Sequence, residues 1–364
     1  MKPLSAVYAM RSIDSFAGRL LEIFVPIYLL KLNYSPKEVF VYYLIYSVSI
    51  FFVFFISANL SHRYGLKSSL FLSLPFLLLY IWMLYSLETF KFPLALIALI
   101  YGARMAFFWF PLHILLVENS KQEEIGRNLA KFHGYSRIVG IAAPFAGAFI
   151  VSTGGFNLLF IIGALVYLLS RFLIFWIPEI RISLDLKLRE AINLVRTYPK
   201  YIVAEIVENT REEIEYIVWP IFVFLIFQNI FSVGIVGSLT AIGSFLFIQL
   251  VGRYTDKSDK RNLLKVGAVV AIFISLARFF FKGEILFYVL SILAGFFGVL
   301  LTIPMSAIGY GIAKKEKVAE FILLRESLIL LVRSGFYILV ILLVNNINYT
   351  FLVSAISNIY FLFY

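Results

Sequence analysis

Charged side chains occur inside stretches of this sequence that are otherwise apolar. Carboxylates stand in two such stretches: Asp14, Glu22, Glu205, Glu208, Glu212, Glu213 and Glu215. The basic residues that we assign to such stretches are all arginines: Arg11, Arg19, Arg104, Arg171, Arg211, Arg278 and Arg333. An ionisable group costs roughly 2.5–3.5 kcal/mol in an apolar membrane interior, so each should face a partner or a water-filled cavity. Groups placed in this way can carry a proton or hold a charged solute.

The spacing of these charges predicts how they pair. Arg11 and Asp14 stand three residues apart, at which distance two side chains meet on a helix. Arg19 and Glu22 have the same spacing. In the second stretch, steps of three, four and three residues place four glutamates on one helical face: Glu205, Glu208, Glu212 and Glu215. Arg211 is placed to meet one of its neighbours in that stripe, Glu208 or Glu215.

Membrane-spanning helices are the elements that must position these groups. Of the 364 residues, 62% are hydrophobic and 15% are charged, against roughly 45–50% and 25% in soluble domains. The apolar runs 71–86 and 269–281 lack the alternation of barrel strands and indicate helices. A span needs about 20 apolar residues. The sequence predicts twelve spans: 7–31, 37–58, 69–88, 92–118, 132–152, 156–177, 200–227, 231–251, 265–281, 284–310, 319–344 and 347–364.

The basic residues between these spans predict the orientation. Only four fall in connections on one side of the membrane: Lys31, Lys37, Lys91 and Lys282. The positive-inside rule therefore predicts a multi-pass protein of the plasma or inner cell membrane with both termini in the cytoplasm. The charged residues of the first span argue against a cleaved signal peptide. The net charge of +11 reflects this topology in the lipid bilayer, and we expect no nucleic-acid partner.

The two halves of the sequence repeat one plan. An offset of about 194 positions relates four pairs of residues: Pro26 and Pro220, Pro111 and Pro304, Lys121 and Lys314, and Arg137 and Arg333. Six spans return the chain to its starting side, so the halves run parallel and are related by an axis along the membrane normal. We predict an N-terminal six-helix bundle at 1–178, a cytoplasmic amphipathic linker at 179–199 and a C-terminal six-helix bundle at 200–364.

A basic motif follows the second span and the eighth. The later copy, GRYTDKSDKR, contains Gly252, Asp256, Lys257 and Arg261. The earlier copy, ANLSHRYGLK, contains Arg63, Gly65 and Lys67, with His62 where an acid would stand. These segments resemble the signature of the major facilitator superfamily between its second and third helices. The resemblance implies twelve helices in two bundles with pseudo-twofold symmetry, and a cytoplasmic gate whose charges pair or separate as the bundles rock.

Two further segments resemble this family. Arg104 stands at the place of the family's arginine that is associated with proton coupling, although Phe107 and Phe108 replace the residues usual beside it. The span 132–152 is similar to the glycine-proline signature of family antiporters and contains Gly140, Pro144 and Gly147. Small residues permit close helix packing and proline permits a bend. Bends are also expected at the repeated prolines: Pro26, Pro111, Pro220 and Pro304.

In the family fold the first, fourth, seventh and tenth helices line a central cavity. The resemblance would place eight charged residues around one site: Asp14, Arg19, Glu22, Arg104, Glu208, Arg211, Glu212 and Glu215. A rise of about 1.5 Å per residue puts Glu212 and Glu215 near mid-depth. We expect them to be partly protonated in one conformation and paired with an arginine in the other, which would couple transport to protons.

The sequence thus predicts a secondary active transporter working by alternating access, specifically a proton-coupled antiporter that exports a small organic solute or drug-like compound. One alternative is an uptake symporter for an organic anion held by Arg19 and Arg104. Another is a non-transporting receptor or a lipid scramblase. Without cysteine, with three histidines and without an ATP-binding phosphate loop, no metal, cofactor or enzyme activity is expected. The protein is expected to function as a monomer.

The predicted topology can be tested with accessibility labels or reporter fusions. Those placed after Lys67, Arg196 and Lys260 should report the cytoplasm, because the basic connections lie there. Those placed near Lys91 and Asn346 should report the outside. A single reversed sign among the five positions would refute the twelve-span map.

Overall fold

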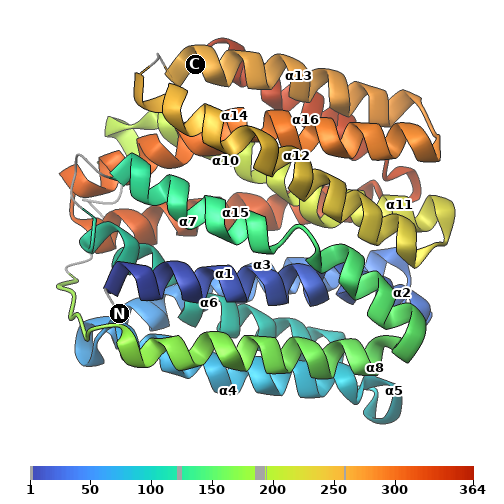
Figure 1. The fold of residues 1–364 in the computed structure, drawn as a ribbon, viewed down its shortest axis with the longest axis horizontal. Coiled ribbons are helices and arrows are strands. Elements are labelled where there is room, and N and C mark those ends of the chain that lie inside the picture. The colour runs from blue at the N-terminus through green and yellow to red at the C-terminus, as the bar shows by residue number, and fades with distance from the viewer. Residues whose placement is uncertain (1–2, 121–124, 185–192, 194, 258–259) are drawn as a thin grey trace.

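A computed structural model describes residues 3–120, 125–184, 193, 195–257 and 260–364 (Figure 1). The described residues form helices and no strand. The first half contains α1 (Pro3–Leu21), η1 (Glu22–Phe24), α2 (Val25–Lys31), α3 (Pro36–Tyr64), α4 (Leu66–Tyr85), α5 (Leu87–Phe90), α6 (Leu94–Glu118), α7 (Ile125–Val139), α8 (Ala143–Phe172) and η3 (Leu173–Trp176). Most of the predicted amphipathic linker lies outside the described residues.

The second half begins with the broken helix α10 (Pro199–Glu213), η4 (Ile214–Val218) and α11 (Trp219–Phe227). It continues with α12 (Ile230–Lys257), α13 (Lys260–Phe280), α14 (Glu284–Lys315), α15 (Val318–Leu342), η5 (Val344–Asn346), α16 (Tyr349–Asn358) and η6 (Ile359–Leu362). Both ends of the described chain lie at the same end of the bundle (Figure 1), which we call the terminal end. The opposite end is called the distal end.

The predicted twelve-helix layout is confirmed. In the described part, 7 helical segments are long and apolar enough to cross a membrane. One of them, Lys131–Trp176, passes through the bundle twice because the chain reverses near Gly155 (Figure 1). The spans outside this set are those with several charges, namely α1 to α2, α10 to α11 and α15, and the short pair α16 and η6. Charged residues set the first three apart from simple apolar spans, and α16 with η6 is apolar but short.

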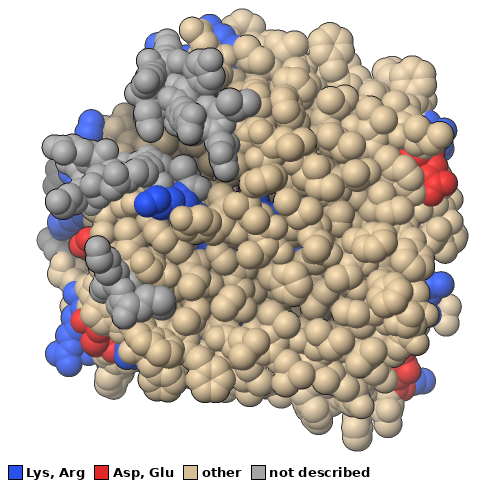
Figure 2. Space-filling model, viewed as in Figure 1, with Lys and Arg blue, Asp and Glu red and all other residues tan. Residues whose placement is uncertain are grey.

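The outer surface is apolar where lipid would surround it. Figure 2 shows Lys, Arg, Asp and Glu gathered mainly at the two ends of the molecule, with a broad uncharged face between them. Large exposed side chains on this belt include Phe52, Phe149, Leu165 and Phe273. In water such a surface would be unfavourable, but lipid tails solvate it well. The molecule is therefore a membrane-embedded, multi-pass protein.

Two six-helix bundles make up the fold and meet along few helices. The main contacts between them join α3 to α15, and α7 and α8 to α12. Within the first bundle, α1 packs along α8, and within the second, α12 packs along α14. The bundles thus touch along two seams, between which the helices with buried charges face each other.

Two helix breaks occur at corresponding places in the repeat. The first helix ends at Leu21, and a 3₁₀ turn leads into α2 with Pro26 in its first turn. Likewise, α10 ends at Glu213, and a π-helical turn leads into α11 with Pro220. Proline lacks the N–H that would continue the preceding helix, and π turns are frequent at functional sites. Of the other repeated or signature prolines, Pro144 begins α8, whereas Pro111 and Pro304 lie within continuous helices.

We predict that the bundles move largely as rigid bodies. The sequence has no cysteine, so spin labels can be introduced directly at exposed positions of the terminal end. A label pair on Tyr64 and Lys315, which spans the two bundles, should change its distance distribution between conformations. The pair on Tyr64 and Glu118, within the first bundle, should keep one distance. The reverse pattern would rule out rocking of one bundle against the other.

Candidate functional site

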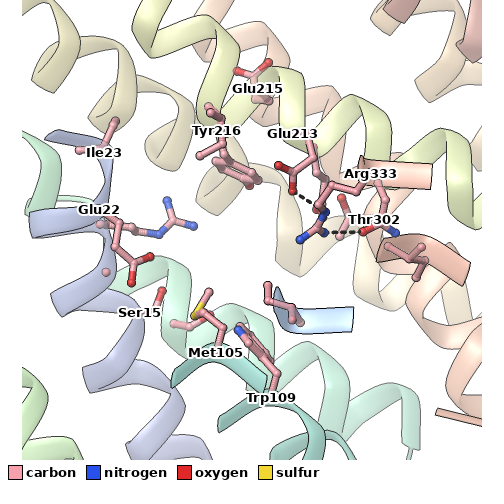
Figure 3. A pocket seen from close by; sticks show the side chains of 18 of the residues that line it. Ser15, Glu22, Ile23, Met105, Trp109, Glu213, Glu215, Tyr216, Thr302 and Arg333 are labelled. Carbon is pink, nitrogen blue, oxygen red and sulfur yellow. Dashed lines mark hydrogen bonds and ion pairs between the residues drawn. The ribbon is translucent and has the colours of Figure 1, made fainter. Parts of the chain in front are cut away.

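A cavity of about 450 Å³ lies between the bundles. It is lined by α1, α3, α6 and α7 of the first bundle and by α10, η4, α12, α14 and α15 of the second. Figure 3 shows Ser15 and Glu22 facing Glu213 and Arg333 across it. Of the eight charged residues predicted to surround one site, the lining includes Asp14, Arg19, Glu22, Arg104, Glu212 and Glu215. The other two, Glu208 and Arg211, are not part of the lining.

Arg104 is the centre of a buried ion network in the first bundle. Its Nη2 lies 3.2 Å from Oδ1 of Asp14, and its Nη1 lies 3.4 Å from Oε1 of Glu22. Arg171 adds a second cation, with Nη2 2.9 Å from Oδ1 of Asp14. Tyr167 donates a 2.5 Å hydrogen bond to Glu22. Two arginines therefore meet two carboxylates, and the network carries no net charge.

These contacts differ from the pairing predicted along the first helix. Asp14 and Glu22 bind arginines of α6 and α8, and neither lies within ion-pair distance of Arg11 or Arg19 in the described structure. Arg11 instead lies over the ring of Trp109, 4.6 Å from its centroid. The expectation was wrong because buried arginines of neighbouring helices compete for the same carboxylates. Arg104 is thus occupied by the protein's own acids.

Two glutamates of the predicted acidic stripe, Glu208 and Glu215, pair with arginines of their own bundle. Arg211 donates hydrogen bonds of 2.8 and 2.7 Å to Glu208, which also accepts one of 2.7 Å from Thr302. Glu215 accepts hydrogen bonds of 2.6 and 3.0 Å from Arg278 on α13. Both glutamates are buried, so their charges need these partners. Neither is free to bind a solute without breaking an ion pair.

Glu213, off the predicted stripe, forms the ion pair that reaches into the cavity. Its Oε1 lies 3.0 Å from Nε of Arg333 on α15 (Figure 3). Tyr337 donates a short hydrogen bond to the same carboxylate. Nη2 of Arg333 donates a 3.3 Å hydrogen bond to Asn209. On the wall of the second bundle, Glu213 and Arg333 therefore neutralise each other.

Four charged groups of the cavity wall lack such a partner in the described structure. One is Arg11 of the first bundle, which lies over Trp109 and whose Nε has no hydrogen-bond partner there. Within the described part of the chain, Glu212 makes no hydrogen bond or ion pair, and Arg19 has no carboxylate within ion-pair distance. Arg137 is 6% exposed, and its Nη1 has no hydrogen-bond partner in the described structure. Arg19 and Arg137 belong to the first bundle and Glu212 to the second. The unpaired groups therefore stand on opposite walls.

Contacts between the bundles lie toward both ends of the cavity. Toward the terminal end, His113 of α6 forms a short hydrogen bond with Tyr310 of α14, and its Nε2 lies 4.0 Å from Oε1 of Glu326. Toward the distal end, Lys31 lies 5.7 Å from the ring centroid of Phe224. Opening the cavity at either end requires separating these groups. Each contact is therefore a candidate gate.

Residues 7–206 match a family model described as Major Facilitator Superfamily. The chain belongs to this superfamily. The fold is also similar to the crystal structure of a major facilitator superfamily transporter, FucP, in the outward conformation. The TM-score is 0.71 at 12% sequence identity, over 99% of this chain and 97% of the other. No curated protein sequence matches the chain.

Membership of the major facilitator superfamily makes this protein a secondary transporter of a small molecule. The resemblance deduced from the sequence motifs is confirmed by the family match and by the fold. At 12% identity the likeness to FucP concerns the fold alone. The solute and its coupling must therefore be argued from this chain's own cavity.

The superfamily signature between the second and third spans lies at the turn from α3 to α4. Gly65 ends α3 with φ of 95°, which favours glycine. The backbone N–H of Lys67 donates a 3.0 Å hydrogen bond to Glu179, which follows the sixth span. A carboxylate from elsewhere thus lies beside the motif, where His62 replaces the usual acid; Arg63 is exposed. In the second copy, Arg261 lies in α13, and the side chains of Gly252, Asp256 and Lys257 lie outside the described residues.

Three charged residues of the cavity wall were not among the predicted membrane charges: Arg137, Arg325 and Glu326. Arg325 forms an ion pair with its neighbour Glu326, and its Nε lies 4.0 Å from Oε1 of Glu205. A signal for Arg137 was available, because the repeat aligns it with Arg333. Arg325 and Glu326 lie inside the predicted span 319–344, so their charge within an apolar stretch was the signal that could have marked them.

The ion network predicts a sharp difference between two substitutions in the same cavity. Asp14→Asn leaves Arg104 and Arg171 buried with too little negative charge, which should cost about 3 kcal/mol or more. Glu212→Gln removes a carboxylate that has no partner and should leave stability unchanged or raised. Thermal unfolding of the purified variants in one detergent measures both. Equal losses in the two variants would contradict the network as described.

Proposed function

We propose that this transporter is coupled to protons and that Glu212 is the group that takes up and releases the proton. The observation that carries the proposal is the isolation of its carboxylate, which lines the cavity without an ion pair or hydrogen bond in the described structure. Burying an unpaired carboxylate is costly, and protonation removes its charge. Protonation would stabilise Glu208 and Glu215 less, because an arginine already neutralises the charge of each carboxylate.

Arginines around Glu212 can make its protonation state depend on the conformation. Arg211 on α10, Arg137 on α7 and Arg333 on α15 attract it electrostatically, and none of them forms an ion pair with it in the described structure. Rocking of the bundles changes the distance from α10 to α7, which belongs to the other bundle, but not the distance to α15. A conformation that brings Arg137 to Glu212 favours the carboxylate, and one that separates them favours the neutral acid. Proton binding then selects a conformation, as coupling requires.

The charge of the solute sets the direction of coupling. A cationic solute would compete with the proton for Glu212, which gives the antiport predicted from the sequence. An anionic solute that engages Arg137 would withdraw that arginine from Glu212, so that solute and proton bind together and are co-transported. Linkage is reciprocal: a solute that weakens proton binding is itself bound less tightly by the protonated protein, and a solute that strengthens proton binding is bound more tightly. One chain forms the whole cavity, which supports a monomer as the working unit.

The proposal predicts the behaviour of Glu212→Gln in proteoliposomes. A thermal-shift panel of metabolites on the wild type first identifies a ligand, because binding to the folded state raises its stability. The variant should lose accumulation driven by a pH gradient and keep counterflow exchange at equal pH, since only the proton step is removed. Glu88→Gln, an exposed glutamate at the distal end, is the control. Unchanged pH dependence in Glu212→Gln would assign the proton to another group.

A further inference from the structure

The repeat reveals a missing carboxylate in the first bundle. In the second bundle, Glu213 on α10 and Arg333 on α15 form an ion pair of 3.0 Å at the cavity. The offset that relates the halves aligns Glu213 with Arg19 on α1, and Arg333 with Arg137 on α7. The equivalent place in the first bundle therefore holds two arginines. The first bundle therefore has no carboxylate where Glu213 stands in the second.

The side chain of Arg19, from α1, reaches the chain just after the C-terminal end of α7, which carries Arg137. A Cβ atom added to Gly140 would lie 2.4 Å from Cδ and 2.8 Å from Nε of Arg19. The Arg19 side chain therefore packs against Gly140, which follows the end of α7 and stands three residues after Arg137. The missing side chain at this position is what makes room for it. Both arginines line the cavity.

Burial makes the missing charge costly. Arg137 is 6% exposed, and its Nη1 has no hydrogen-bond partner in the described part of the structure. Arg19 repels it, and Glu212 attracts it from across the cavity without reaching ion-pair distance. An unsatisfied buried charge of this kind is strongly stabilised by an anion that enters the cavity.

We propose that Arg19 and Arg137 together bind the carboxylate or phosphate group of an anionic solute. That group would complete, in the first bundle, the ion pair that Glu213 makes in the second. Two guanidinium groups suit an oxyanion because each can donate paired, charge-assisted hydrogen bonds. This role differs from that of Arg104, whose charge is balanced by Asp14 and Glu22. Aromatic side chains that line the same cavity, among them Trp109 and Tyr216, can contact the uncharged body of the solute.

The inference deepens the proposed function and rests on it for the direction of coupling alone. An anion on Arg137 removes the attraction that favours the charged form of Glu212. Anion and proton are then taken up together, and the transporter is a symporter of an organic anion with a proton. The anion site itself exists whether or not Glu212 is the proton carrier.

The site can be tested with defined probes on the purified full-length protein. Inorganic phosphate, benzoate and phenyl phosphate are titrated in thermal-shift and calorimetric experiments at constant ionic strength in chloride. Benzamide is the neutral counterpart of benzoate. We expect phosphate and at least one aromatic oxyanion to stabilise the protein with a saturating dependence on concentration, and benzamide to have no effect. Preference for benzoate or for phenyl phosphate then distinguishes carboxylate from organophosphate solutes.

Variants assign the effect to the two arginines. Arg19→Gln and Arg137→Gln should each weaken oxyanion binding by about tenfold or more, as expected for the loss of a charged hydrogen-bond donor. Arg137→Lys should weaken it less, because the charge is kept while the fork geometry is lost. Gly140→Ala should also weaken it, because the added methyl group displaces Arg19. Arg181→Gln, at an exposed arginine that follows the sixth span, is the matched control.

The outcomes separate this inference from the proton proposal. Stabilisation by phosphate that persists equally in all variants would be a general salt effect and would overturn the site. Absence of any oxyanion effect in the wild type would also overturn it. Glu212→Gln should retain oxyanion binding whichever group carries the proton. If Glu212→Gln keeps its pH coupling while the arginine variants lose binding, the proton proposal fails and the anion site stands.

Discussion

A charge inside a bilayer must be neutralised by its immediate neighbours, and this constraint organises the whole molecule. In the first bundle, Asp14 and Glu22 balance Arg104 and Arg171, and the four side chains tie the first, fourth and sixth spans together. Lipid offers no alternative partner, so each helix must present its charge to the others. The network thereby fixes the helices whose inner faces form one wall of the cavity.

The second bundle obeys the same constraint with different connections. Its acids stand mainly on one helix, α10, and reach arginines on that helix, on α13 and on α15. In the described structure, the charged groups of the cavity wall without an ion pair are Arg11, Arg19 and Arg137 on one wall and Glu212 on the other. A transport site needs such groups, because a charge that the protein already satisfies has little affinity left for a solute or a proton. Under the proposals made above, binding and coupling take place at this boundary between the bundles.

Helix breaks and seams let the cavity change without dismantling these networks. The breaks before Pro26 and Pro220 put Glu22 and Glu215 at irregular turns, where backbone shifts disturb fewer helical hydrogen bonds. The bundles meet along the seams between α3 and α15 and between α8 and α12. Each network tying helices together lies within one bundle, so the bundles can rock while those ion pairs stay intact. The contacts at the cavity ends, such as His113 with Tyr310, join the two bundles and would have to break when an end opens.

The sequence by itself determined the membrane class, the twelve spans, the repeat and most of the charged residues of the site. These follow from hydropathy, length and spacing along one segment, which are local properties. The ion pairs were decided only by the tertiary structure. Asp14 lies closer in sequence to Arg11 but pairs with Arg104 and Arg171, because helix packing brings these buried side chains to its carboxylate. The same holds for Arg137, whose lack of a partner is a property of everything packed around it. The tertiary structure therefore decides which charged residues pair within the fold and which stay unpaired and available for function.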